Sequence, residues 1–437
     1  MTLASYRDQF AAFTDNGGRA GPAWLPALRR RAFDRFAATG FPTTRDEDWH
    51  YTSVSPIAES TFRLVRPAAS SVDLSAIAPY LINPSWSRLV FVNGRFSREL
   101  STFAELPAEV DVTTLDDALR TDAAYLESQL GEHARIDHNP FAALNTAFVT
   151  DGAVVRIPAD CVVEKPIHVL WVSDAAAADA IVCPRVLVTA GRHSRVSIIE
   201  SFVGLAPERS FTNSVTEIRL DDGARVDHHR IQRESTDAFH VGTVQATQRR
   251  NSVFHSFSFA AGARLSRANI YTTLAEPGCE ARLNGLYLLS GRQHCDHQTY
   301  VHHAAELCVS REMYKGILDD ESHGVFNGKV LVDAVAQKTD GKQTNHTLLL
   351  SDRARVDTKP QLEIFADDVR CTHGATVGRL DETALFYLKS RGIHRDTARA
   401  LLTYAFAAEA LGEIEIDELR DALQALAFER YNDSVLG

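Results

Sequence analysis

The pattern of hydrophobic and polar positions divides the chain into three parts. Before about residue 150, apolar residues at helix spacing predict a helix over residues 26–38. Helix start and stop signals predict two more, over residues 114–130 and 139–148. After residue 378 the helical pattern returns and predicts three more helices, over residues 381–391, 396–406 and 416–431. We therefore expect a helical and mixed N-terminal region (1–150) and a C-terminal helical domain (379–437).

The middle of the chain, residues 151–378, consists of short β-rich runs separated by turns that contain Gly, Asp and Asn. A unit made of a turn, a small residue, Arg and an aliphatic residue recurs five times, and the copies at residues 263–265 and 281–283 lie closest together. Recurring strand-and-turn units predict a β-solenoid, in which successive coils stack as parallel sheets. A large antiparallel sandwich is the alternative.

Composition narrows the possible functions. Hydrophobic residues make up 45% and charged residues 24% of the chain, as in an ordinary globular protein, and the net charge of −11 argues against a broad nucleic-acid-binding surface. No apolar run is long enough to predict a membrane span, and the first residues do not form a secretory signal. The six cysteines include no C-x-x-C pair, so we expect free thiols in a cytoplasmic protein.

The clearest candidate site is the pair Cys371 and His373. In a β-strand, two residues separated by one position point to the same face. A thiolate and an imidazole suit iron, zinc or iron–sulfur species, and Gly374 and Gly378 leave the backbone open to close approach. Two ligands do not complete a four-coordinate site, so we expect a partner chain to supply the others. The alternative is a buried structural cysteine.

A second group of ligand-type side chains lies between residues 294 and 303. We take His294, His297 and His302 as a possible secondary metal site, although such side chains can also hydrogen-bond along the coils of a β-stack. The sequence contains no phosphate-binding loop, dinucleotide fingerprint or zinc-protease motif, and no convincing catalytic triad. We therefore expect no intrinsic nucleotide site and no enzyme active site in this chain.

Longer motifs carry a resemblance to a known family. They occupy residues 284–297, 314–316, 326–329, 336–340, 345–351, 359–364, 371–378 and 386–392. Near the N-terminus, Asp-Glu-Asp-Trp-His-Tyr-Thr (residues 46–52) is similar to an acidic-Trp-x-Tyr motif. Together these segments resemble the SufB/SufD family of iron–sulfur cluster assembly proteins, and the SufD branch most.

The resemblance implies a right-handed parallel β-helix with helical ends, which agrees with the solenoid prediction. It also implies a SufBCD complex, in which a SufB subunit joins this chain through the β-helix ends and the SufC ATPase docks on the C-terminal helices. Residue by residue, the nascent cluster or iron at the SufB interface maps to Cys371 and His373. The ATPase contact maps to Phe386, Tyr387, Leu401, Leu402 and Phe406.

Three alternatives remain open at this point. A chain expressed alone can form a homodimer in place of the heterodimer. The chain can be a purely structural scaffold subunit that contributes no ligand. It can also be a cupin-like metal-binding protein that uses the histidines between residues 294 and 303.

Overall fold

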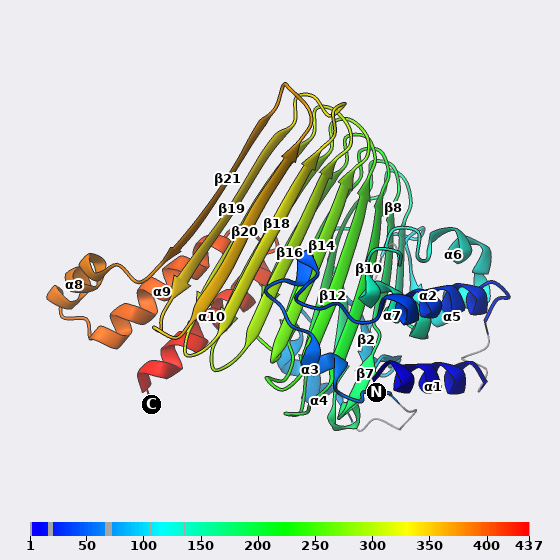
Figure 1. Cartoon of the computed structure of the whole chain (residues 1–437), viewed down its shortest axis with the longest axis horizontal. Coiled ribbons are helices and arrows are strands. Elements are labelled where there is room, and N and C mark those ends of the chain that lie inside the picture. Colours follow the sequence, from blue (N-terminus) through cyan, green and yellow to red (C-terminus); the bar gives the residue numbers. More distant parts are fainter. Residues whose placement is uncertain (1, 16–20, 66–71, 105, 135, 437) are drawn as a thin grey trace.

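The computed structural model describes residues 2–15, 21–65, 72–104, 106–134 and 136–436. Its centre is a β-solenoid, in which the chain passes alternately through two facing sheets, here called sheet A and sheet B (Figure 1). Except for the pairs β2–β3 and β4–β5 at the N-terminal end, neighbouring strands pair in parallel. The predicted parallel solenoid is therefore confirmed, and the antiparallel sandwich is wrong.

Sheet A contains eleven strands, and most of them have even numbers. They are β1 (Arg63–Leu64), β4 (Asp111–Thr114), β5 (Ala153–Ile157), β7 (Ala180–Val182), β8 (Arg185–Ala190), β10 (Phe211–Leu220), β12 (Phe239–Gln248), β14 (Leu265–Leu274), β16 (His294–His303), β18 (His323–Val332) and β20 (Arg355–Ile364).

Sheet B contains ten strands and runs in the order β21-β19-β17-β15-β13-β11-β9-β6-β2-β3. Its strands are β2 (Ser87–Val92), β3 (Arg95–Phe96), β6 (Ile167–Ser173), β9 (Arg195–Gly204), β11 (Arg225–Arg233), β13 (Val253–Ala260), β15 (Glu280–Leu289), β17 (Val309–Leu318), β19 (Asp340–Leu349) and β21 (Arg370–Gly378).

The length of a coil varies along the solenoid. Phe239 pairs in register with Leu265, whereas His323 pairs with Arg355, and the second coil is longer because its turns contain more residues. Successive strands of one sheet are thus farther apart in the chain than the sequence units at residues 263–265 and 281–283, and the close spacing of these two units does not mark one coil. The first unit begins β14 in sheet A, and the second lies in β15 of sheet B.

The two sheets bury their facing side chains between them. Successive strand residues alternate between the inside and the outside, and the inside is filled by aromatic and aliphatic residues such as Phe202, Phe254, Leu283 and Phe326. Polar side chains are also buried in the coils, including Glu312 and Gln343. The interior is therefore apolar along much of its length and polar in places, and the polar places bear on the site described below.

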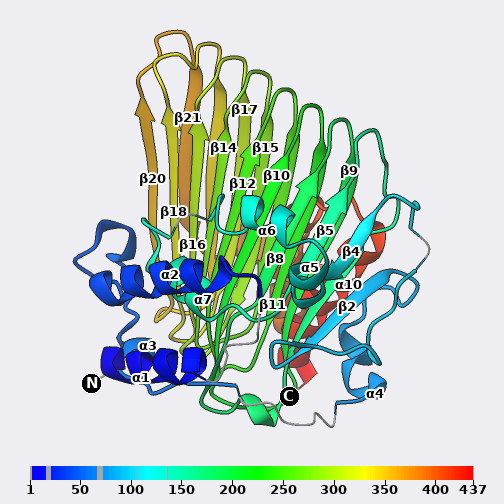
Figure 2. The same ribbon diagram turned by 90° about the vertical axis from the view of Figure 1, so that its right-hand side faces the viewer.

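The N-terminal region covers the outer face of sheet A (Figure 2). Phe10, Phe33 and Phe148 pack with Phe211 and Phe239 of sheet A in one cluster. The helices of this region are α1 (Thr2–Asp15), α2 (Leu25–Thr39), η1 (Glu47–Trp49), α3 (Ser55–Ala58), α4 (Leu74–Ile77), η2 (Ala78–Tyr80), α5 (Leu115–Thr121), α6 (Ala123–Gln129) and α7 (Pro140–Phe148), and η3 (Ala175–Ala177) follows β6.

The predicted helix over residues 114–130 is two helices. Thr114 caps α5 as expected, since its hydroxyl accepts the backbone N–H of Asp117 at 3.0 Å. The chain then leaves helical geometry at Asp122, whose φ and ψ are −145° and 54°, before α6 begins. The Asp122 carboxylate accepts a hydrogen bond from Arg156 of β5. This contact lies outside what local periodicity can predict.

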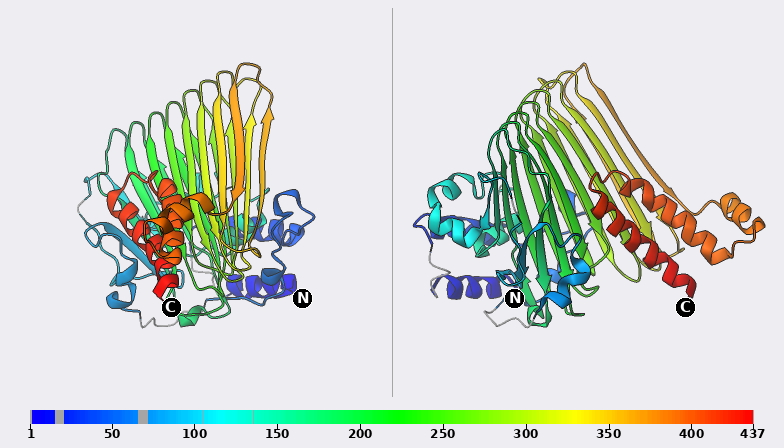
Figure 3. Two further views of the ribbon diagram at one scale, coloured as in Figure 1. Left: turned by 90° about the vertical axis from the view of Figure 1, so that its left-hand side faces the viewer. Right: turned by 180° about the vertical axis from the view of Figure 1, so that it is seen from behind.

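The C-terminal region forms three helices, α8 (Glu382–Ser390), α9 (Arg395–Leu411) and α10 (Asp417–Leu436). Helices α9 and α10 lie antiparallel across the outer face of sheet B, whereas α8 projects away from the coils (Figure 3). Asp381 caps α8 through the backbone N–H of Thr383. None of the helices in the described ranges is long and apolar enough to cross a membrane.

Candidate functional site

The last coil leaves one end of the solenoid open. Strand β20 ends sheet A and β21 ends sheet B, so each pairs with a strand on one side only (Figure 1). Several apolar side chains are exposed there: Ile364 by 37%, Phe365 by 65% and Val377 by 49%. An exposed strand edge with apolar side chains is a surface onto which another chain can pair.

Cys371 and His373 lie on β21 and point inward, toward the interior of the last coil. Cys371 pairs in register with Gly341 of β19, and His373 pairs with Gln343. Cys371 is half-buried against the interior core, while His373 is exposed. A Cβ atom at Gly341 would lie 3.3 Å from the Cys371 sulfur, so this glycine makes room for the thiol. The structure thus brings the predicted pair together on one strand face at the open end.

Burial controls the protonation of the thiol. It raises the pKa of Cys371 above its ordinary value; a backbone hydrogen bond at Gly341 offsets this effect in part, and the nearby Asp340 carboxylate adds to it. The thiol is therefore protonated at neutral pH. Because the thiolate is the form that binds metals, a metal ion must displace this proton when it binds.

The pair does not form a complete metal site within this chain. Among the residues that the structure describes, no group of three or more His, Cys, Asp and Glu side chains is placed to hold a metal ion. A Cβ atom built at Gly374 or Gly378 would have no atom within 4 Å, so the backbone beside the pair is open. This geometry permits ligands from a second molecule to approach the pair.

The expected secondary metal set is not assembled. His297 points into the coils, where its ring contacts the Ser258 hydroxyl at 3.1 Å, and burial lowers its pKa to about 3. His294 and His302 belong to the opposite face of β16, where His302 contacts Asp333 at 2.9 Å. The sheet itself therefore separates His297 from the other two, because the side-chain period of a strand is two.

The residues expected to dock a partner on the C-terminal helices fall into two groups. Phe386, Tyr387 and Leu401 are exposed, by 72%, 57% and 40%. Leu402 is half-buried, and Phe406 packs against the core between α9 and sheet B, with the Lys315 ammonium 4.3 Å from its ring centre. Only the first group presents free apolar surface.

Sequence reasoning missed the role of the acidic-Trp segment. The Arg267 guanidinium of β14 lies 3.6 Å from the Trp49 ring centre and donates to the Asp48 carbonyl at 2.7 Å. Arg267 also pairs with Asp296 at 2.6 Å, and both side chains are almost fully buried. The segment is thus fastened to the outside of sheet A. The sequence shows an acidic residue at 296, but its burial and its pairing with Arg267 follow only from the register between β14 and β16.

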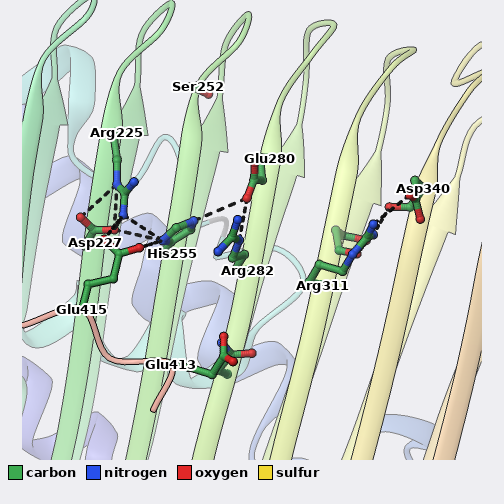
Figure 4. Close-up of polar contacts among 12 residues, drawn as sticks. Arg225, Asp227, Ser252, His255, Glu280, Arg282, Arg311, Asp340, Glu413 and Glu415 are labelled. Atoms are coloured by element: carbon green, nitrogen blue, oxygen red, sulfur yellow. Dashed lines mark hydrogen bonds and ion pairs between the residues drawn. The ribbon is translucent and has the colours of Figure 1, made fainter. Parts of the chain in front are cut away.

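A charged cluster that the sequence did not indicate connects the loop between helices α9 and α10 to sheet B (Figure 4). Glu415, in the loop between α9 and α10, accepts a hydrogen bond from Arg225 at 2.6 Å, and Arg225 also binds Asp227. Burial alone would raise the pKa of Asp227, but hydrogen bonds from His255 and Arg225 outweigh it and lower that pKa to about 2. The ionised carboxylate therefore anchors the cluster at all physiological pH values.

Comparison with known proteins identifies the family. The sequence model of the SufBD core domain of the SUF system matches residues 172–406, and that of the SufBD N-terminal region matches residues 2–169. An iron–sulfur cluster assembly SufBD family protein of Synechocystis is 36% identical over 91% of this chain and 89% of its own length.

Two proteins named SufD are also similar over most of both lengths. The iron–sulfur cluster assembly protein SufD of Escherichia coli is 31% identical over 89% of this chain and 88% of its own. SufD of Bacillus subtilis is 26% identical over 92% and 93%. The coils, the paired soft ligands at their open end and these matches agree. The chain belongs to the SufB/SufD family of the SUF system for iron–sulfur cluster assembly and is most like SufD.

Proposed function

We propose that this chain is the SufD-like subunit of a SufBCD scaffold and contributes Cys371 and His373 to a nascent iron–sulfur cluster. The observation that carries the proposal is an incomplete pair of soft ligands on β21, an edge strand that pairs with β19 on one side and has its other side open. A SufB-type subunit that adds its own coils to this edge would bring further ligands to the pair. The cluster, or iron, is then a cargo shared between two chains.

The open end supplies the surface that such a heterodimer needs. Unpaired backbone groups along β20 and β21 can continue the ladders of both sheets into a partner, while Phe365 and Val377 lose exposed apolar area. A homodimer would use the same edge when the chain is expressed without SufB. A cupin-like protein is not supported, because cupins are antiparallel double-sheet folds and these coils are parallel.

The exposed residues of α8 and α9 form the proposed contact with the SufC ATPase. Phe386, Tyr387 and Leu401 offer the aromatic and aliphatic anchors typical of interface centres. Because α9 is fastened to sheet B through its loop, a movement of the ATPase would act on the coils themselves. In this proposal nucleotide hydrolysis belongs to the ATPase and this chain performs no turnover.

The proposal is tested by co-expression with a SufB and a SufC protein, followed by anaerobic purification and analysis of iron and sulfide. We expect a stable ternary complex. The double variant Cys371→Ser/His373→Ala should assemble the same complex and lose most of its bound iron and sulfide.

The matched control is the double variant Cys161→Ser/His394→Ala, which removes another half-buried thiol and another exposed imidazole. It should retain iron and sulfide. Full loading of the Cys371/His373 variant would show a purely structural subunit, and failure to form any ternary complex would contradict the proposal as a whole.

A further inference from the structure

A row of inward-facing polar residues leads from the interior of the solenoid to the open end. Glu312 of β17 pairs in register with Gln343 of β19, which pairs in register with His373 of β21. Register partners in adjacent parallel strands stand about 4.8 Å apart and point the same way. The three side chains are therefore consecutive members of one row, and His373 is the member that reaches the surface.

The middle member of this row is held from two sides. The Gln343 amide is buried, with 1% of the residue exposed, and its Nε2 donates to Glu312 Oε1 at 3.1 Å. From the opposite sheet, Gly328 makes room for it, since a Cβ atom there would lie 2.1 Å from Nε2 and 2.7 Å from Cδ. The position of the amide is thus fixed, and a side chain larger than that of Gly328 would displace it.

The bond to Glu312 also fixes which way the amide faces. Nε2 needs an acceptor, and the Glu312 carboxylate provides one, so the carbonyl oxygen Oε1 is the free end. Oε1 is buried and accepts no hydrogen bond from any described residue. A buried acceptor without a donor destabilises the folded chain, so this oxygen gains from a hydrogen bond. The next side chain in the row is His373, whose exposed ring has no hydrogen bond to any residue in the described ranges.

We infer that Gln343 is a positioning residue for His373: its Oε1 accepts one ring N–H of His373 and leaves the other ring nitrogen facing the open end as a metal ligand. Histidines that bind metals commonly donate their second N–H to an acceptor of this kind, which fixes the tautomer and the orientation of the ring. The inference rests on the proposed role of His373 as a ligand. Glu312 acts one step further back, by holding the amide.

The hydrogen bond is tested directly in the full-length chain, without metal. Histidine labelled with ¹⁵N reports the tautomer of His373, and the signal is assigned by its loss in His373→Ala. We expect one predominant tautomer in the wild type. Gln343→Met, which keeps the size and removes the acceptor, should give a mixture of tautomers, and Gly328→Ala should do the same by displacing the amide.

Two further variants separate positioning from general damage. Gln343→Glu keeps an acceptor and should restore the single tautomer. Thr347→Val removes a different buried polar group, a hydroxyl, from the inward face of β19 and should leave the tautomer as in the wild type. An unchanged His373 signal in both Gln343→Met and Gly328→Ala would overturn the inference.

Iron binding then distinguishes this inference from the proposed function. In the complex with the SufB protein, Gln343→Met should weaken Fe²⁺ binding by about 10- to 100-fold, the usual effect of losing an acceptor behind a histidine ligand. If His373→Ala weakens binding and Gln343→Met does not, the positioning role is wrong and the proposed function stands. If His373→Ala has no effect on iron while the tautomer follows Gln343, the hydrogen bond exists and the ligand role is wrong.

Discussion

The buried carboxylate of Glu312 makes a strong prediction for the pH dependence of stability. Burial raises its pKa from 4.5 to about 7, and the hydrogen bond from Gln343 offsets this effect only in part. Between these two pH values the folded chain holds a proton on Glu312 that the unfolded chain has lost. Stability therefore falls as the pH rises through this window. A shift of this size corresponds to ~3 kcal/mol, because one pKa unit corresponds to about 1.4 kcal/mol.

The variant Glu312→Gln removes the titration and keeps a carbonyl that can accept the Gln343 Nε2 hydrogen bond. We expect it to match the wild type near pH 4.5 and to exceed it by ~3 kcal/mol at pH 8. Hydrogen exchange of peptides covering β17, read by mass spectrometry at several pH values, measures the difference in opening free energy locally. Glu306→Gln, at the exposed turn before β17, is the control. A stability difference that does not change with pH would refute the reasoning.

Three other predictions follow from single side chains. The Arg185–Glu217 pair is almost fully buried, so Arg185→Met leaves an unpaired buried carboxylate and should cost about 3–5 kcal/mol in urea unfolding; a loss below about 1 kcal/mol would contradict this. Because burial raises the pKa of Cys371, its alkylation by iodoacetamide at pH 7 should be slower than that of the unfolded chain, and an equal rate would contradict the buried thiol. For the proposed contact with a SufC ATPase, Phe386→Ala should weaken binding at least tenfold with unchanged thermal stability, whereas Leu74→Ala, also exposed, should leave binding intact; equal binding by both variants would exclude Phe386 from the proposed contact.

Local patterns in the sequence were sufficient for the types of element and for the candidate pair. Short β-rich runs and turn residues predicted the strands of the solenoid, and helix signals predicted α2, α7 and the C-terminal helices. Cys371 and His373 were found because two residues on one strand face are separated by a single position, which is a local property. The incomplete pair already predicted a partner chain, and the family resemblance added the expectation that a SufB-type partner joins through the ends of the β-helix.

Contacts between coils were decided only by the tertiary structure. Glu312, Gln343 and His373 are each separated by a whole coil of the chain, and the coil length changes along the solenoid, so no fixed period reveals that they form a row. The sequence units at residues 263–265 and 281–283 likewise do not mark successive coils, because they lie at strands of different sheets. The break of the predicted helix at Asp122 is another case, since Arg156 reaches it from β5.

The secondary histidines show the limit of residue spacing most plainly. His294, His297 and His302 lie close together in the chain, yet the sheet holds His297 inside and the other two outside. The sequence by itself determined which chemistry is available and on which side of a strand it lies. The stacking of the coils decided which of these side chains meet, because side chains on neighbouring coils come within contact distance only when the register, set by the length of each turn, brings them together.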